Sequence, residues 1–361
     1  MKKLTAVILT VGLAAAGGGL FHALDVPAGW LTGAMIAVAA GAMARVPLHM
    51  PAPAANGALV LLGMSMGAGV TPDTLRQAAA WPLSILVLAV LVVASIAVCS
   101  FWFERIHGWD RATARFAAIP GALPAVLAMA VGTSADLPRV ALAQSLRLVT
   151  LVAVMPPLLR WLAVPSTEAT TSIGTPGNLS GFLLLLGASA AAAGLMYRMR
   201  FPGGVLLGAM MASAVLHGTG MIQGLLPPDL LAAGFTAIGA VIGSRFRGVK
   251  LSTLLVILRP SLESVVLALV ISGMCAGIAS ALLDLPMGQI WLAYTPGGIE
   301  AMSIVAFALG FDVAFVGMHH VVRFAGLGLI VPWWQTRWSM PTSAPGNQSA
   351  TDNEVSARIV P

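Results

Sequence analysis

Two arginines lie in the middle of apolar stretches, where a charged side chain is costly. Arg147 lies within PRVALAQSLRLVTLVAVMPPLL, and Arg323 lies within DVAFVGMHHVVRFAGLGLIVPWW. Burying an arginine in a bilayer costs about 2.5 to 3.5 kcal/mol on insertion scales, so each one needs a partner or a ligand. One interpretation is a pair that binds an anionic ligand. The other is a pair of structural arginines that hydrogen-bond the carbonyls of a neighbouring broken helix, and the two roles are compatible.

Polar residues accompany both arginines at the same spacing. Gln144 stands three residues before Arg147, and His320 stands three residues before Arg323, so each pair shares one face of a helix. His319 precedes His320 directly. A histidine here can relay a proton, because its reference pKa near 6.5 lies in the physiological range. The alternative is a buried imidazole that is hydrogen-bonded to a carbonyl.

Four ionisable residues are candidates for binding a coupling ion or a proton, namely Glu300, His319, Asp136 and Asp312. Glu300 follows TPGGI directly, whereas the first half of the chain has Pro124 at the matching position. Only the second half therefore has this carboxylate, and a coupling role is one interpretation of that asymmetry. A simple salt bridge between Glu300 and Arg323 is the other. The two aspartates stand at the start of the stretches that contain the arginines.

The stretch before each arginine contains helix breakers, in RFAAIPGALPAVLAMAVG and again in AYTPGGIEAMSIVAFALG. A break in lipid leaves backbone groups without partners, so each segment must be buried in protein or face a wet cavity, as a discontinuous span or a re-entrant hairpin. New helices start near Ala125 and Ala301, and their free amide groups favour anions. The candidate substrate-binding residues are therefore Arg147, Arg323, Gln144, His320, Pro120, Gly121, Pro296, Gly297 and Gly298.

The chain contains the same membrane unit twice. Residues 4–29 match residues 179–204 at an offset of 175 residues (179 − 4), and after a one-residue slip the offset becomes 176 residues (323 − 147). Internal repeats in an apolar chain favour a transporter, because two related units can build one site at their interface and rock about it. The paired glycines Gly63 with Gly67 and Gly239 with Gly243 predict close helix packing.

Composition places the chain in a membrane. It has 58% hydrophobic and 9% charged residues, and many apolar runs approach the roughly 20 residues that a spanning helix needs. The formal charge of +6 comes from basic residues scattered in short connections. This pattern fits positive-inside topology better than a nucleic-acid-binding face. We therefore expect the lipid bilayer and a small-molecule or ion ligand as partners, and no nucleic acid; the sequence leaves a homodimer open.

The predicted fold is an all-α polytopic membrane protein with two inverted repeats. Each repeat has about five transmembrane helices and one broken or re-entrant segment, and the odd number of crossings inverts the second copy relative to the first. The alternative counts six crossings in each half and gives a parallel pair. The predicted domains are residues 1–163 as the first repeat, 164–178 as a linker, 179–339 as the second repeat and 340–361 as a disordered cytoplasmic tail.

Signals for metal or nucleotide chemistry are weak. The six histidines are spread along the chain, without the spaced trio and carboxylate that copper or iron needs, and the sequence has no Walker loop. Cys99 and Cys275 lie within apolar spans and are interpreted as small core residues. We therefore expect no metal, no cofactor and no enzymatic activity.

The paired motifs identify a family. IPGALPAVLAMA at 119–130, YTPGGIEAMSIVAFALG at 294–310 and VLLGAM from Val205 resemble the membrane AbrB family, and the resemblance covers about residues 5–336. Proteins of this family are labelled as regulators of gene expression or as ammonia monooxygenases, and they are grouped with the cation/proton antiporter and bile-acid-type transporters. The resemblance implies a duplicated membrane unit with broken helices. The monooxygenase label would require metal ligands, which this sequence lacks.

These observations predict a secondary transporter of a small anionic solute, coupled to a proton or a sodium ion, as a multi-pass protein of the inner (plasma) membrane. The alternative is a membrane sensor or regulator that binds its ligand without moving it. Direct DNA binding would need a soluble module, and no connection exceeds about 20 residues before the tail. Any effect on gene expression would therefore be indirect.

Overall fold

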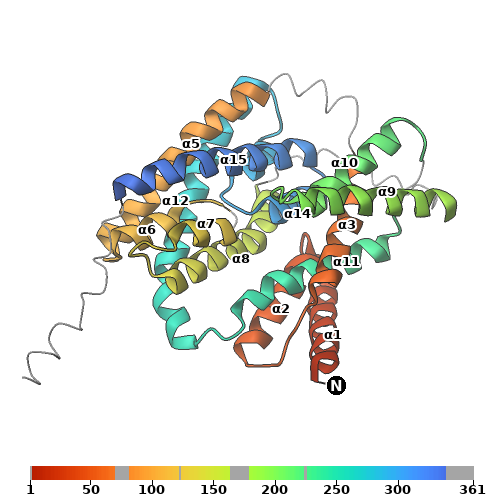
Figure 1. Cartoon of the computed structure of the whole chain (residues 1–361), viewed down its shortest axis with the longest axis horizontal. Helices are drawn as coiled ribbons and strands as arrows, with labels where there is room; N and C mark the ends of the chain where they lie inside the picture. Colours follow the sequence, from red (N-terminus) through yellow and green to blue (C-terminus); the bar gives the residue numbers. More distant parts are fainter. Residues whose placement is uncertain (1, 70–80, 122, 163–178, 223–225, 339–361) are drawn as a thin grey trace, which may run out of the picture.

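The computed structural model describes residues 2–69, 81–121, 123–162, 179–222 and 226–338. Within these ranges the regular structure is entirely helical (Figure 1). The predicted linker at 164–178 and the predicted tail at 340–361 lie outside the described residues.

The helices follow one order twice along the chain. The first half has α1 (Lys2–Ala23), α2 (Gly29–Met43), α3 (Ala52–Ala68), α5 (Trp81–Phe101), the π-helix η2 (Trp102–Ile106), α6 (Arg111–Ala118), α7 (Leu123–Ala130) and α8 (Leu137–Trp161). The second half has α9 (Leu179–Arg198), α10 (Gly204–Gly218), α11 (Pro228–Gly243), the 3-10 helix η3 (Ser244–Phe246), α12 (Leu251–Leu283), α13 (Met287–Tyr294), α14 (Ile299–Ala308) and α15 (Val313–Trp338).

Six of the described helices are long and apolar enough to cross a membrane, namely α1, α5, α8, α9, α12 and the segment Pro228–Phe246 that joins α11 to η3. Several of them expose large apolar side chains, among them Ile8 on α1, Leu86 on α5, Leu183 on α9 and Val266 on α12. Outward-facing apolar surface on long helices is what contact with lipid requires. The fold class is therefore that of a polytopic membrane protein, as the sequence predicted.

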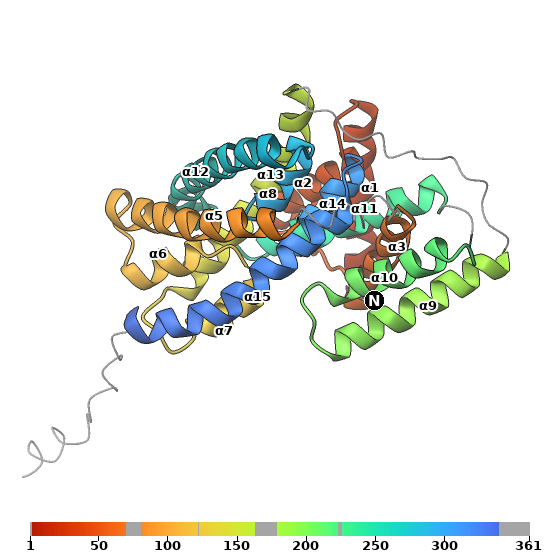
Figure 2. The ribbon, with the colours of Figure 1, turned by 90° about the horizontal axis from the view of Figure 1, so that it is seen from above.

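The helices assemble into two bundles, and each bundle contains elements from both halves of the chain. The first bundle packs α1, α2 and α3 together with α9, α10 and α11, whereas the second packs α5 to α8 together with α12 to α15. Figures 1 and 2 show α5, α6, α7 and α12 at the left of both views, and α3, α9, α10 and α11 at the right. The two sequence halves thus interleave, and neither forms a separate body.

The predicted close packing at the paired glycines is confirmed, and it joins the two halves inside the first bundle. A Cβ on Gly63 or Gly67 would meet the backbone of α10, and a Cβ on Gly239 or Gly243 would meet the backbone of α2. Helix α3 therefore packs closely against α10, and α11 packs against α2 in the same way. Only glycine permits backbones to approach this closely.

The predicted helix breaks are also confirmed. Helix α6 ends at Ala118 and α7 begins at Leu123, while α13 ends at Tyr294 and α14 begins at Ile299. Both new helices begin two residues before the expected positions. In α7 this places Pro124 in the first turn, where a missing N–H group is harmless because that group would lack a helical partner anyway.

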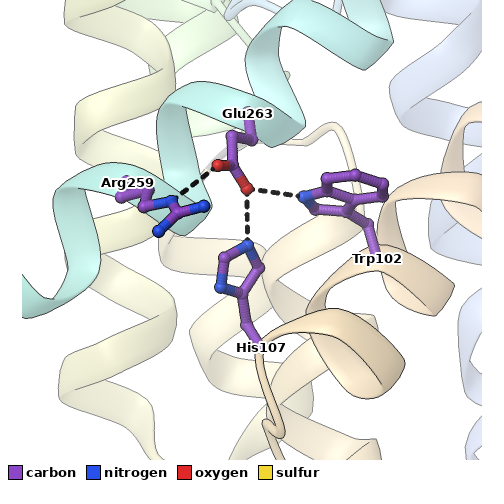
Figure 3. A network of polar contacts seen from close by, with 4 residues as sticks. All are labelled: Trp102, His107, Arg259 and Glu263. Carbon is purple, nitrogen blue, oxygen red and sulfur yellow. Dashed lines mark hydrogen bonds and ion pairs between the residues drawn. The ribbon is translucent and has the colours of Figure 1, made fainter.

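A polar network ties η2 and the loop after it to α12 (Figure 3). The carboxylate of Glu263 accepts from Trp102 Nε1 at 3.0 Å through Oε2 and from Arg259 Nε at 2.9 Å through Oε1. Its Oε2 also lies 2.6 Å from His107 Nε2. One carboxylate therefore has three partners from two segments that are far apart in the sequence.

We expect Glu263→Gln to lower the free energy of unfolding by about 1–2 kcal/mol, because an amide group presents N–H donors to partners that themselves donate. Thermal unfolding of the purified protein in detergent measures the change. Arg259→Gln is the control, since the Arg259 side chain is 82% exposed and an exposed ion pair contributes about 0.2–1 kcal/mol at most. Equal melting temperatures for both variants would contradict this role of Glu263.

Candidate functional site

A cavity of about 300 Å³ lies between the two bundles. The second bundle contributes both broken segments and both helices that contain the buried arginines, and the first bundle contributes α3, η3, α11 and the turn before α10. The cavity includes all nine candidate substrate-binding residues: Arg147, Arg323, Gln144, His320, Pro120, Gly121, Pro296, Gly297 and Gly298. The structure thus brings this whole set together, and its role in binding is still a prediction.

Arg147 is 8% exposed and hydrogen-bonds the end of the first helix before the break. Its guanidinium donates to the carbonyls of Ala117 and Ile119 at 3.0 Å each, and to that of Ala118 at 3.5 Å. These carbonyls have no helical partner, because α6 stops at Ala118. The arginine therefore satisfies the backbone at the break and also offsets the negative end of the α6 dipole.

Arg323 does the same at the second break. It is 6% exposed, and its guanidinium donates to the carbonyls of Thr295 at 2.8 Å and Gly297 at 2.6 Å. The contacts of Arg147 with Ile119 and of Arg323 with Thr295 are separated by the same offset of 176 residues (295 − 119). The structural role that the sequence left open for the arginines is thus present in the structure, and both side chains also line the cavity.

Gln144 and His320 form a second repeated contact one turn earlier. Gln144 Nε2 donates to the carbonyl of Phe116 at 3.0 Å, and His320 Nε2 lies 3.2 Å from the carbonyl of Leu292. His320 Nδ1 lies 2.5 Å from a guanidinium nitrogen of Arg323, which can only donate. Nε2 faces a carbonyl, which accepts, and Nδ1 faces a guanidinium, which donates. The hydrogen-bond network therefore assigns the proton to Nε2 and makes His320 a neutral imidazole.

Glu300 lines the cavity from the first turn of α14. Its side chain makes no hydrogen bond or ion pair within 4.0 Å with any described residue, so the salt bridge with Arg323 that the sequence left open is absent. Glu300 is therefore a solvent-accessible carboxylate in a cavity whose other charged side chains are arginines.

Arg245 lines the cavity but is not among the site residues that the sequence predicts. It belongs to η3, is solvent-accessible, and likewise makes no hydrogen bond or ion pair with a described residue. It lines the same cavity as Glu300, so a positive and a negative side chain are both present there. The sequence signal was present but weak: Arg245 follows Gly243 by two residues, whereas the matching position of the first half is Gly69.

Three of the four candidates for a coupling ion or proton lie away from the cavity. His319 Nδ1 donates to the carbonyl of Phe315 at 2.8 Å, and its Nε2 lies 3.0 Å from Ser84 Oγ. Asp136 Oδ1 accepts from the amide of Arg139 at 3.0 Å, which makes it the N-cap of α8.

Asp312 is the corresponding residue at the start of α15. Its Oδ1 accepts from the amides of Ala314 at 2.8 Å and Phe315 at 3.1 Å. An aspartate placed directly before a helix pairs amides that would otherwise lack partners. Among the described residues no group of three His, Cys, Asp or Glu side chains is arranged to hold a metal.

The sequence matches one family model and two curated relatives. The family described as "Transition state regulatory protein AbrB" matches residues 30–339. A protein of Escherichia coli (strain K12), named "Putative regulator AbrB", is 28% identical over 318 residues, which cover 86% of this chain and 90% of the relative. A protein of Bacillus subtilis (strain 168), named "Uncharacterized protein YhjN", is 25% identical over 358 residues and covers 90% of this chain and 91% of the relative. The family match includes every residue that lines the cavity.

Proposed function

The chain belongs to the AbrB family, and from that membership together with the cavity we propose that it is a secondary transporter of a small anionic solute. We further propose that it lies in the inner (plasma) membrane and is not an enzyme. The observation that carries the proposal is the cavity between two bundles, in which both broken segments and both buried arginines meet. Discontinuous helices at such an interface are the usual way in which transporters bind a charged solute within the membrane.

The charge of the cavity supports an anion as the solute. Its side chains include three arginines, Arg147, Arg245 and Arg323, against the single carboxylate of Glu300. Gly298, which caps the start of α14, also lines the cavity, so the positive end of that helix dipole lies at the cavity wall. Confined in a low-dielectric surrounding, these groups attract a negative solute more strongly than they would in water.

Glu300 is the one ionisable candidate that faces the cavity, and we assign the binding of a coupling proton or sodium ion to it. The two bundles supply the moving parts, because a site at their interface opens to either side when one bundle shifts against the other. A sensor remains the second candidate, favoured by the printed name of the Escherichia coli relative, "Putative regulator AbrB".

Counterflow in proteoliposomes tests the proposal. Vesicles that contain the purified protein are loaded with unlabelled acetate, phosphate, succinate, citrate or glutamate, and the entry of the same labelled compound is followed. A transporter accelerates the entry of at least one of these anions over protein-free vesicles. Saturable binding without any exchange would instead identify a sensor, and the transport proposal would then be wrong.

A further inference from the structure

We propose that the solute carries an ammonium group in addition to its carboxylates, and that Arg245 and Glu300 select it. The class that fits is the amino dicarboxylates, of which aspartate and glutamate are the simplest probes. This inference rests on the proposed function, because it describes the solute that occupies the same cavity, and in it the ammonium group of the solute takes the place of a separate coupling cation at Glu300.

Arg245 and Glu300 line the same cavity from different bundles. Arg245 is in η3 of the first bundle, and Glu300 is in α14 of the second. Both side chains are solvent-accessible, and they do not form an ion pair with each other. A guanidinium with five N–H donors and a carboxylate that accepts from several sides are therefore both available to a ligand that lies between them.

The other two arginines are differently placed. Arg147 and Arg323 direct hydrogen bonds at the carbonyls where α6 and α13 end, so part of their charge is already balanced by the backbone. Arg245 has no such partner among the described residues. It is thus the cation of the cavity that is free to pair with a carboxylate of the solute in a bidentate manner.

The carboxylate of Glu300 opposes a purely anionic solute. A dicarboxylate bound beside it would place like charges close together, whereas an ammonium group at that position would form an ion pair and hydrogen bonds. The formal side-chain charge of the cavity is +2, from three arginines and one glutamate. A solute with two carboxylates and one ammonium group is still an anion overall, so it suits the net positive charge of the cavity. Its ammonium group in addition complements the negative charge of Glu300.

The repeat supports a role in selection. The arginines that hold the broken segments and their partners Gln144 and His320 occur in both halves of the chain. Arg245 and Glu300 occur only in the second half, where the first half has Gly69 and Pro124. The repeated architecture therefore does not need these two charges, and a use in recognising the solute explains why they face one cavity.

Matched pairs of compounds test the proposal. Binding of glutamate and glutarate, and of aspartate and succinate, is measured by titration calorimetry on the purified protein in detergent at pH 7.5. Within each pair the carbon skeleton is the same and only the amino group differs. We expect the amino member to bind at least about tenfold more tightly to the wild-type protein, a preference equivalent to about 1.4 kcal/mol.

Two variants identify the groups that recognise the solute. Glu300→Gln should reduce the preference for the amino member to about threefold or less, because the amide no longer pairs with ammonium and no longer repels the dicarboxylate. Arg245→Gln should weaken both members of each pair by similar factors. Neither side chain bonds another described residue, so both variants should keep the wild-type melting temperature, which is measured in parallel.

The results separate this inference from the proposed function. Equal binding of both members by the wild-type protein, an unchanged preference in Glu300→Gln, or no binding of any of the four compounds would each overturn the inference. If equal binding is accompanied by a pH dependence that Glu300→Gln removes, then Glu300 binds the proton and transport of a simple anion stands. Failure of every anion in counterflow, by contrast, refutes transport itself.

Discussion

Replacing Arg323 with methionine is expected to abolish solute uptake and to lower the free energy of unfolding by roughly 2–5 kcal/mol. Methionine cannot donate to the carbonyls of Thr295 and Gly297, or to His320 Nδ1. Each buried acceptor that loses its partner costs about 1–3 kcal/mol. Part of this cost is offset, because the variant no longer buries a charge within the membrane.

Two measurements follow the effect of this substitution. Thermal unfolding in detergent reports stability, and initial uptake rates in proteoliposomes, normalised to folded protein, report function. Arg323→Lys separates charge from geometry, because lysine keeps the charge but lacks the planar group that bonds two carbonyls at once, so we expect it to recover little uptake.

Arg147→Met should reproduce both defects, since Arg147 makes the equivalent contacts at the first break. The matched control is Arg259→Met, at a side chain that is 82% exposed, which should keep wild-type uptake and lose at most about 1 kcal/mol of stability. If Arg323→Met kept wild-type stability and uptake, the arginine would be neither the support of the broken segment nor part of the site.

The second large effect is expected at the crossing of α11 with α2. Gly243→Leu introduces a side chain where a Cβ already meets the backbone of Met35 and Ala39 and the side chain of Val38. Overpacking typically costs about 1–3 kcal/mol, and we expect more here, because the obstacle is backbone that cannot rotate away. The change also moves Arg245, which follows two residues later, so uptake should fall even in the folded fraction.

Gly187→Leu on α9 is the control for this substitution, because a Cβ there has no atom within 4 Å. It tests whether leucine in place of a helical glycine is harmful in itself. Melting temperature in detergent and the fraction of monodisperse protein after solubilisation are the measurements. Similar losses for both substitutions would show that close packing at Gly243 is not what limits stability.

Much of the site follows from local sequence. The proline and glycine residues of TPGGI interrupt a helix wherever they stand in an apolar run, because proline removes a donor and glycine lowers helix propensity. The spacing of three residues between His320 and Arg323 places both on one helix face in any fold. Local rules of this kind predict the nine candidate substrate-binding residues, and all nine line one cavity.

Other site features depended on the rotation and packing of whole helices. His319 is the direct neighbour of His320, yet it points between helices and bonds Ser84, because adjacent residues on a helix face directions about 100° apart. Asp136 and Asp312 stand where a helix begins. Each carboxylate therefore accepts hydrogen bonds from amide groups in the first turn of that helix and does not face the cavity. Sequence spacing cannot distinguish such a cap from an ion site.

By itself, the sequence determined the membrane class, the duplicated helix order, the two breaks and the arginine beside each break, since all of these depend on composition and short-range spacing. Only the tertiary structure decided that the halves interleave as two bundles and that Arg245 and Glu300 share a cavity. Fifty-five residues separate those two charges (300 − 245), and the packing of α11 against α2 is what positions η3 and Arg245. Their placement in one cavity is a property of the assembled bundles, because no periodic pattern in the chain encodes how the two bundles pack.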